Sequence, residues 1–187
     1  MKDLIEACLF ASGDVVSPED FARRTGYDAS IVEQEFATLW AEYGERDGSG
    51  IAIVRVAGGY QMATRPELAD QIGKFVASAS GRSSLSRAAL ETLAIVAYKQ
   101  PATQFEIEAV RGVSIEAVLK TLMDRNLVCV SGRRQTPGRP LLYSTTDDFL
   151  KYFGLDTLEE LPKLELSDTD REDGIARHMV EMAVGIE

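Results

Sequence analysis

The chain carries one sequence pattern twice, and this duplication constrains its fold more than any other feature. An apolar helical run, a break and a capped second helix are written LIEACLFASGDVVSPEDFARRTG near the start and LAIVAYKQPATQFEIEAVRG from Leu93. A shift of 86 residues (97 minus 11) places Ala11 on Ala97 and Ser17 on Thr103. Self-similarity on this scale indicates a duplicated domain rather than a short solenoid repeat.

Each copy continues with a further helix, a pair of strands and a closing helix, so that QMATRPEL in the first copy corresponds to LYSTTDDF in the second. Three helices with a short turn and a β hairpin are typical of the winged helix-turn-helix. We therefore expect a mainly α fold with small β wings (an α+β class), built from two tandem winged helix-turn-helix domains.

Changes in composition mark the expected domain boundaries. The stretch SASGRSS is small, polar and free of large apolar side chains, which predicts a linker at residues 78–84. We expect winged-helix domains at residues 1–77 and 85–162, each large enough for a modest core. Residues 163–187 include the charged run LELSDTDREDG, which predicts an acidic, disordered tail.

Local signals place the elements of the first copy. Ser17 followed by Pro18 predicts the start of the second helix. Ser30 has a glutamate three residues later, a capping-box pattern that predicts the start of a third helix whose apolar face includes Trp40. Two alternating runs on either side of Gly58-Gly59 predict a β hairpin.

The second copy has matching signals. Thr103 with Glu106 is another capping-box pattern, and Ser114 is the expected cap of the next helix. The runs LVCVSG and LLYSTT predict two strands, joined by the loop RRQTPGRP. Thr145 is the expected cap of a closing helix.

The net charge of −10 is distributed unevenly along the chain. Residues 1–81 carry 7 basic and 13 acidic side chains, whereas residues 82–143 carry 9 basic and 5 acidic ones. The remaining residues are acidic, mainly because those from 155 onward have 3 basic and 10 acidic side chains. An acidic chain disfavours tight nonspecific DNA binding, although the second module keeps a mildly basic character.

Residues suited to catalysis or metal binding are scarce. His178 lies alone in the expected tail, and Cys8 and Cys129 are too far apart in sequence to predict a ligand set. No complete phosphate-binding loop pattern and no apolar run long enough for a membrane span is present in the sequence. We expect no enzyme activity, no metal and no cofactor, and reduced thiols in a cytoplasmic protein.

The helices that would read DNA in winged-helix proteins lack the usual side chains for it. The segment ASIVEQEFATLWAEYGE contains no cation. The segment SIEAVLKTLMDRN offers Lys120 and Arg125, but these are offset by Glu116 and Asp124.

The expected wing of the second module is more basic. Arg133, Arg134 and Arg139 lie in one loop whose two prolines restrict its shape. A phosphate contact and a merely solvated loop are both compatible with this pattern.

Several long motifs of the second module resemble the segregation and condensation protein B family of bacteria. The stretch LSRAALETLAIVAYKQPATQFEIEAVRGV is followed by VLKTLMDRNLVCVSGRRQTPGRPLLYSTTDDFLKYFGLDTLEELP, and AYKQP, RGV, PGRP and YFGL match the family pattern. The first module matches more loosely, through IEACLFASGD and GGYQMATRPE.

This resemblance implies a non-enzymatic subunit of the bacterial condensin. The family's proteins form homodimers and bind a kleisin subunit, segregation and condensation protein A, which bridges the heads of a structural-maintenance-of-chromosomes ATPase. The implied role is chromosome condensation and partition during cell division, in the cytoplasm at the nucleoid, with DNA contacted only weakly or indirectly. The alternative is a winged-helix transcriptional regulator that binds DNA.

Two groups of residues are expected to make the protein contacts. The apolar stripe of the first helix predicts a homodimer interface at Leu4, Ile5, Cys8 and Leu9. Aromatic side chains dominate binding hot spots, and those of the second module, with one wing arginine, are the expected kleisin contacts: Tyr98, Arg139, Tyr143, Phe149, Tyr152 and Phe153.

Overall fold

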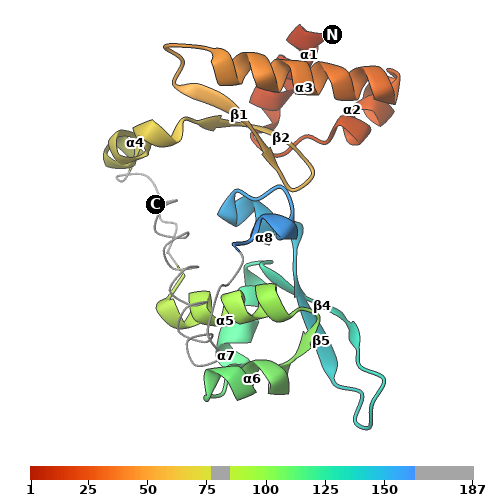
Figure 1. The fold of residues 1–187 in the computed structure, drawn as a ribbon, viewed down its shortest axis with the longest axis vertical. Coiled ribbons are helices and arrows are strands. Elements are labelled where there is room, and N and C mark those ends of the chain that lie inside the picture. The colour runs from red at the N-terminus through yellow and green to blue at the C-terminus, as the bar shows by residue number, and fades with distance from the viewer. Residues whose placement is uncertain (77–84, 163–187) are drawn as a thin grey trace. The chain divides into compact units, whose positions relative to one another are not determined.

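The computed structural model describes residues 1–76 and 85–162 (Figure 1). The expected linker at 78–84 and the expected tail at 163–187 lie outside these residues. The described residues before the gap group with Gly154–Thr157 into one compact unit, and the others form a second unit. The sequence had placed Gly154–Thr157 in the second module. Both units combine helices with a small antiparallel sheet, so the fold is mixed α and β.

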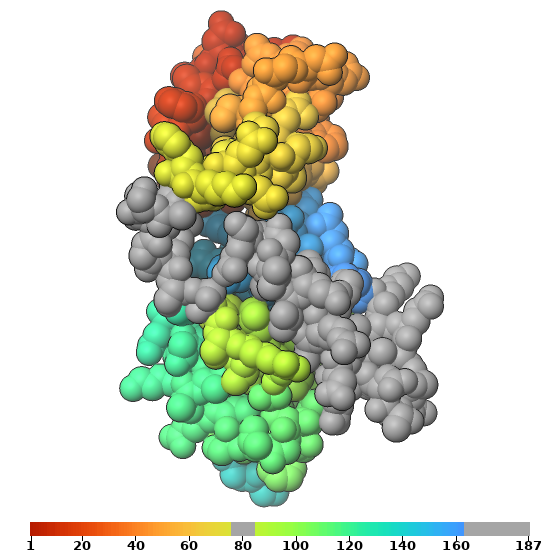
Figure 2. Space-filling view, turned by 90° about the vertical axis from the view of Figure 1, so that its left-hand side faces the viewer, coloured from red at the N-terminus to blue at the C-terminus, as the bar shows by residue number. Residues whose placement is uncertain are grey.

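The first unit packs three helices against a β hairpin. Its elements are α1 (Lys2–Ser12), α2 (Pro18–Thr25), α3 (Ala29–Glu45), β1 (Ile51–Val56), β2 (Gly59–Thr64), the 3-10 turn η1 (Pro66–Leu68) and α4 (Ala69–Val76). Apolar side chains from the first three helices and the hairpin form its core: Ile5, Leu9, Phe21, Ala22, Val32, Phe36, Leu39, Tyr43, Ile53 and Tyr60. Figure 2 shows α4, in yellow, at the surface of this unit.

Of the two N-cap residues predicted in the first unit, one is confirmed and the other is wrong. Ser17 caps α2 as predicted, since its hydroxyl accepts a hydrogen bond from the Asp20 amide at 3.0 Å. The expected Ser30 cap is wrong. Asp28 caps α3 instead, because its carboxylate accepts the amides of residues 30 and 31. Tyr43 of this helix lies in the core, whereas Trp40, which was expected on its apolar face, is exposed.

The hairpin turn lies one residue earlier than predicted. Ala57 and Gly58 have φ of 50° and 70°, the left-handed values of a tight two-residue turn. Gly59 is the first residue of β2, where an added Cβ would stand 2.6 Å from Val15 Cγ1. This glycine therefore permits close approach of the preceding loop, which joins the strand through a bridge between Val16 and Tyr60.

The second unit repeats the first unit's order of helices and hairpin strands, with an additional short strand between its first two helices. Its elements are α5 (Arg87–Lys99), β3 (Ala102–Thr103), α6 (Gln104–Arg111), α7 (Glu116–Asp124), β4 (Val128–Arg133), β5 (Leu141–Thr145), α8 (Asp147–Phe153) and the 3-10 turn η2 (Leu158–Glu160). The sheet order is β3-β5-β4, all antiparallel. The most buried side chains include Leu93, Val96, Ile107, Leu122 and Phe149. Figure 1 shows the β4–β5 hairpin extending beyond the helices of this unit.

Of the three helix caps predicted in this unit, one is confirmed and two are wrong. The capping box of Thr103 and Glu106 is confirmed. Ser114 does not cap α7; the helix starts at Glu116, and the amide of residue 115 donates to the Glu108 carboxylate at 3.1 Å. Thr145 ends strand β5, and the neighbouring hydroxyl of Thr146 accepts the Phe149 amide of α8 instead.

The duplication is visible in strand pairing as well as in helix order. Val16 bridges to Tyr60 in the first unit, and Ala102 pairs with Tyr143 in the second. The same shift of 86 residues relates Val16 to Ala102. In both units the segment before α2 or α6 therefore pairs with the returning strand of the hairpin.

Candidate functional site

A charged pair joins α6 to Arg134, the first residue of the loop between β4 and β5. The Arg134 guanidinium donates to both carboxylate oxygens of Glu106, at 2.5 and 2.9 Å. Glu106 also accepts the Thr103 amide and hydroxyl, each at 2.9 Å. These hydrogen bonds, the Thr103 amide first and Arg134 next, lower the pKa of Glu106 to about 2. The carboxylate is therefore ionised throughout the physiological range, and it fixes the wing to the helix.

Backbone contacts give the wing loop its shape. Arg133 donates to the Arg139 carbonyl at 3.2 Å, and the Arg139 amide donates to the Thr136 carbonyl at 2.9 Å. Gly138 and Arg139 have φ of 83° and 40°. The expected phosphate contact is therefore weakened at Arg134, whose guanidinium is occupied by Glu106, whereas the side chain of Arg139 is exposed.

An exposed apolar stripe runs along α6 beside this pair. Phe105 is 79% exposed and Val113, just after the helix, is 56% exposed. Ala109 lies between them at the same four-residue spacing and is also exposed. The stripe borders a groove of about 430 Å³, lined by Lys99, Pro101, Ala102, Phe105, Glu106, Ala109, Val110 and Arg134.

Most of the predicted kleisin-contact aromatics belong to the core. Tyr143, Phe149 and Phe153 are buried, so in this structure they offer almost no surface to a partner. Tyr98 is half-buried, and its hydroxyl donates to the carbonyl of residue 162 at 2.9 Å. Tyr152 is half-buried against Phe153, with ring centroids 5.1 Å apart.

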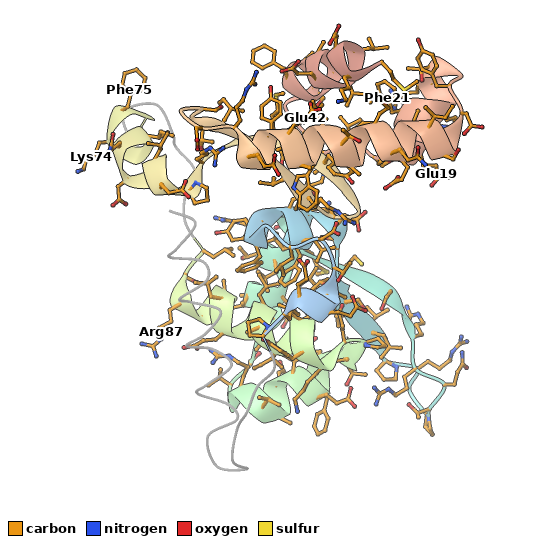
Figure 3. The ribbon with its side chains drawn as sticks, turned by 45° about the horizontal axis from the view of Figure 1, so that its top comes forward. Glu19, Phe21, Glu42, Lys74, Phe75 and Arg87 are labelled. Carbon is orange, nitrogen blue, oxygen red and sulfur yellow. The ribbon has the colours of Figure 1, made fainter. Side chains whose placement is uncertain are left out.

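Sequence reasoning missed Phe105, although the duplication contains a signal for it. The shift of 86 residues aligns Phe105 with Glu19, an exposed residue of α2 (labelled in Figure 3). The same shift aligns Ala109 with Arg23, which is also exposed. An apolar side chain at a position that is charged in the other copy is not required by the shared fold.

The predicted dimer residues of α1 differ in how deeply they are buried. Ile5 and Leu9 are core residues with almost no exposed surface, so they are unsuited to the interface that the sequence predicted. Cys8 is half-buried and Leu4 is exposed. Sequence reasoning missed Phe10, which is 80% exposed on the same helix.

Phe10 borders a groove of the first unit that has a volume of about 580 Å³. The groove lies among α1, the end of α3 and the hairpin, and is lined by Asp3, Glu6, Ala7, Leu9, Phe10, Gly13, Tyr43, Arg46, Ser49, Ile51, Met62, Ala63 and Thr64. A second exposed phenylalanine, Phe75, lies on α4 and is 87% exposed; Figure 3 shows it pointing away from the helix.

The third helix of each unit presents a surface with little positive charge. On α3, Glu33 and Glu42 are exposed, and Glu42 pairs with Lys2 of α1. On α7, exposed Lys120 is accompanied by Glu116 and by Asp124. Neither helix presents the cluster of cations that contacts with DNA phosphates require.

Within the described residues, no group of three or more histidine, cysteine, aspartate or glutamate side chains is arranged to hold a metal ion. Among the same residues, no helix has the length and apolar character needed to cross a membrane. His178 lies outside the described part of the chain.

Comparisons with known proteins give consistent matches. The family model described as "Segregation and condensation complex subunit ScpB" matches residues 3–164. Segregation and condensation protein B of Moorella thermoacetica is 46% identical over 165 residues, which cover 88% of this chain and 83% of that protein. The protein of the same name from Geobacillus thermodenitrificans is 48% identical over 164 residues, covering 87% and 78%. The crystal structure of ScpB from Mycobacterium tuberculosis is 35% identical, covers 82% of this chain and 94% of that chain, and gives a TM-score of 0.39.

Proposed function

The chain belongs to the segregation and condensation complex subunit ScpB family, and from this premise we propose that it is a non-catalytic docking subunit of the bacterial condensin. Its role is to bind the kleisin, segregation and condensation protein A, and through it the structural-maintenance-of-chromosomes ATPase. The observation that carries the proposal is the family match over residues 3–164, because it spans both copies of the duplicated module.

The helix order and sheet topology of the two units support an assignment as tandem winged-helix domains at residues 1–77 and 85–162. In each domain the helix that would read DNA lacks a cationic face. A winged helix of this kind is suited to docking protein segments, since function depends on the surface groups and not on the fold alone. The lack of a cationic face on these helices also disfavours the alternative, a transcriptional regulator that binds DNA.

The first unit is the proposed dimerisation module and the second the proposed kleisin-docking module. In the first, exposed Phe10 borders a largely apolar groove and Leu4 is exposed on the same helix, which is the kind of surface that a second copy covers. In the second, the exposed stripe of α6 and the half-buried Tyr98 and Tyr152 are the proposed apolar contacts.

The direct test is calorimetry of the full-length protein with the purified kleisin of the same organism. We expect saturable binding with a negative heat-capacity change, because the contact buries apolar surface. Absence of binding by calorimetry and by co-purification from co-expressing cells would contradict the docking function.

A further inference from the structure

The outward face of α6 is apolar, and packing within its own unit does not explain this. Pro101, Phe105, Ala109 and Val113 recur every four residues and all four are exposed. A side chain as large as phenylalanine that is 79% exposed contributes little to the core of the unit. Phe105 and Ala109 are four residues apart on α6 and therefore lie on the same face, and Pro101, which precedes the helix, lines the same groove.

The other copy of the module provides an internal comparison. At the positions equivalent to Phe105 and Ala109, helix α2 carries Glu19 and Arg23. Phe21 and Ile107, which also correspond, are both apolar and buried. The fold therefore tolerates charge at these two positions, and folding alone does not require Phe105 and Ala109 to be apolar.

The charged side chains around the groove beside the stripe are mainly positive. Among its lining residues, Lys99 is exposed and has no ion-pair partner within the described part of the chain, whereas Arg134 is balanced by Glu106. The exposed side chains of Arg133 and Arg139 add two cations on the adjoining wing. The edge of this apolar surface is therefore positive, although the whole chain has a net charge of −10.

We propose that the α6 stripe and its groove bind an amphipathic, acidic segment of the kleisin, with a large apolar side chain in the groove and carboxylates toward Lys99 and the wing. This inference rests on the proposed function, which it extends by naming the surface and the chemistry of the bound segment. A groove of about 430 Å³ accommodates one or two large side chains. Phosphate groups of nucleic acid would gain nothing from Phe105, which favours a protein segment over DNA.

The test uses two substitutions in the full-length protein. Phe105→Glu installs the residue that the other copy carries at this position, near the N-terminus of a helix, where an acidic side chain is favourable. Lys99→Glu reverses the charge at the groove. Phe75→Glu is the matched control, because Phe75 is an equally exposed phenylalanine of the other unit. Thermal unfolding by circular dichroism is expected to be unchanged for all three variants.

Calorimetry with the purified kleisin is expected to show at least about tenfold weaker binding for Phe105→Glu, as for a buried aromatic anchor, and wild-type binding for the Phe75 control. Lys99→Glu is expected to weaken binding and to reduce its dependence on salt. Wild-type affinity of Phe105→Glu would overturn this inference and leave the docking function intact, whereas a wild-type protein that does not bind the kleisin would overturn both. Loss of duplex DNA binding or of self-association by Phe105→Glu, with kleisin binding unchanged, would assign the stripe to DNA or to a second copy and reject the proposal.

Discussion

At the scale of single residues, Glu106 joins the start of helix α6 to the wing loop. It completes the capping box of α6 with Thr103 and holds the wing through Arg134. A sequence motif predicts the first interaction, because both partners lie within one helical turn. The second joins residues 28 positions apart and depends on how the hairpin packs against the helix.

Replacing Glu106 with Gln is expected to lower the free energy of unfolding by about 1 kcal/mol at neutral pH. This is a discounted figure, because the side chains of Arg134 and Glu106 are 38% and 40% exposed and water screens their attraction. The folded-state pKa lies below the ordinary value of 4.5, so the stabilisation is complete above pH 4.5 and is lost as the pH falls toward 2.

Urea unfolding of both proteins at several pH values measures this difference, which should shrink below pH 4.5. Glu116→Gln serves as the control, since Glu116 is also an exposed first-turn glutamate. An equal loss for both variants, or a difference independent of pH, would reject the role of Glu106.

Gly59 offers a second prediction at this scale. Gly59→Ala is expected to destabilise the protein by about 1–3 kcal/mol, because the new Cβ would lie 2.6 Å from Val15 Cγ1 and 3.0 Å from the Val16 carbonyl oxygen. Gly44→Ala, in helix α3 with no atom within 4 Å of the new Cβ, should instead stabilise slightly. Thermal unfolding of the two variants checks the opposite signs; equal effects would disprove the close approach.

At the scale of elements, the two copies differ most where they face outward. Helices α2 and α6 share a hydroxyl cap and one buried apolar position, Phe21 and Ile107, but α6 has Phe105 and Ala109 where α2 has Glu19 and Arg23. The loop between β4 and β5 likewise extends the second hairpin by several residues beyond the two-residue turn of the first. Duplication therefore preserved the scaffold and left the surfaces free to diverge.

The wing loop makes a prediction about backbone conformation. Arg139 has a left-handed φ of 40°, which costs a residue with a Cβ about 1–2 kcal/mol. Arg139→Gly should therefore leave the stability unchanged or raise it slightly, whereas Gly138→Ala, at φ of 83°, should lower it by about 1 kcal/mol. Urea unfolding distinguishes the two, and a comparable loss in both variants would contradict the assigned strain.

At the scale of the whole molecule, we expect a homodimer formed through the first unit. Phe10→Asp should give monomers that keep the fold, because the side chain is 80% exposed. Ile5→Asp should unfold the unit instead, because it would place a charge in the core. Light scattering with circular dichroism separates these outcomes, with Phe75→Asp as the control. A wild-type protein that is monomeric at tens of micromolar would refute the dimer.

Charge distribution predicts weak DNA binding by the isolated protein. Arg134 is paired with Glu106, so the wing offers about two free cations, far fewer than the 6–10 phosphate contacts of a committed DNA-binding protein. Fluorescence anisotropy with a labelled duplex at about 150 mM salt should show little binding. Sub-micromolar binding that is abolished by replacing the three wing arginines with glutamate would restore the DNA-binding hypothesis.

The sequence by itself determined the duplication, the order of the helices and hairpin strands, and the caps at Ser17 and Thr103. These features are set by residues within one or two turns of each other, so periodicity and side-chain chemistry are sufficient to read them. Tertiary structure decided which apolar side chains remain at the surface. Ile5 and Phe10 are both apolar residues of the first helix, yet Ile5 is buried and Phe10 is exposed. Phe149 and Phe105 are both phenylalanines of the second unit, yet Phe149 is buried and Phe105 is exposed. Burial depends on packing against elements that are distant in sequence, and only the folded chain brings those elements together.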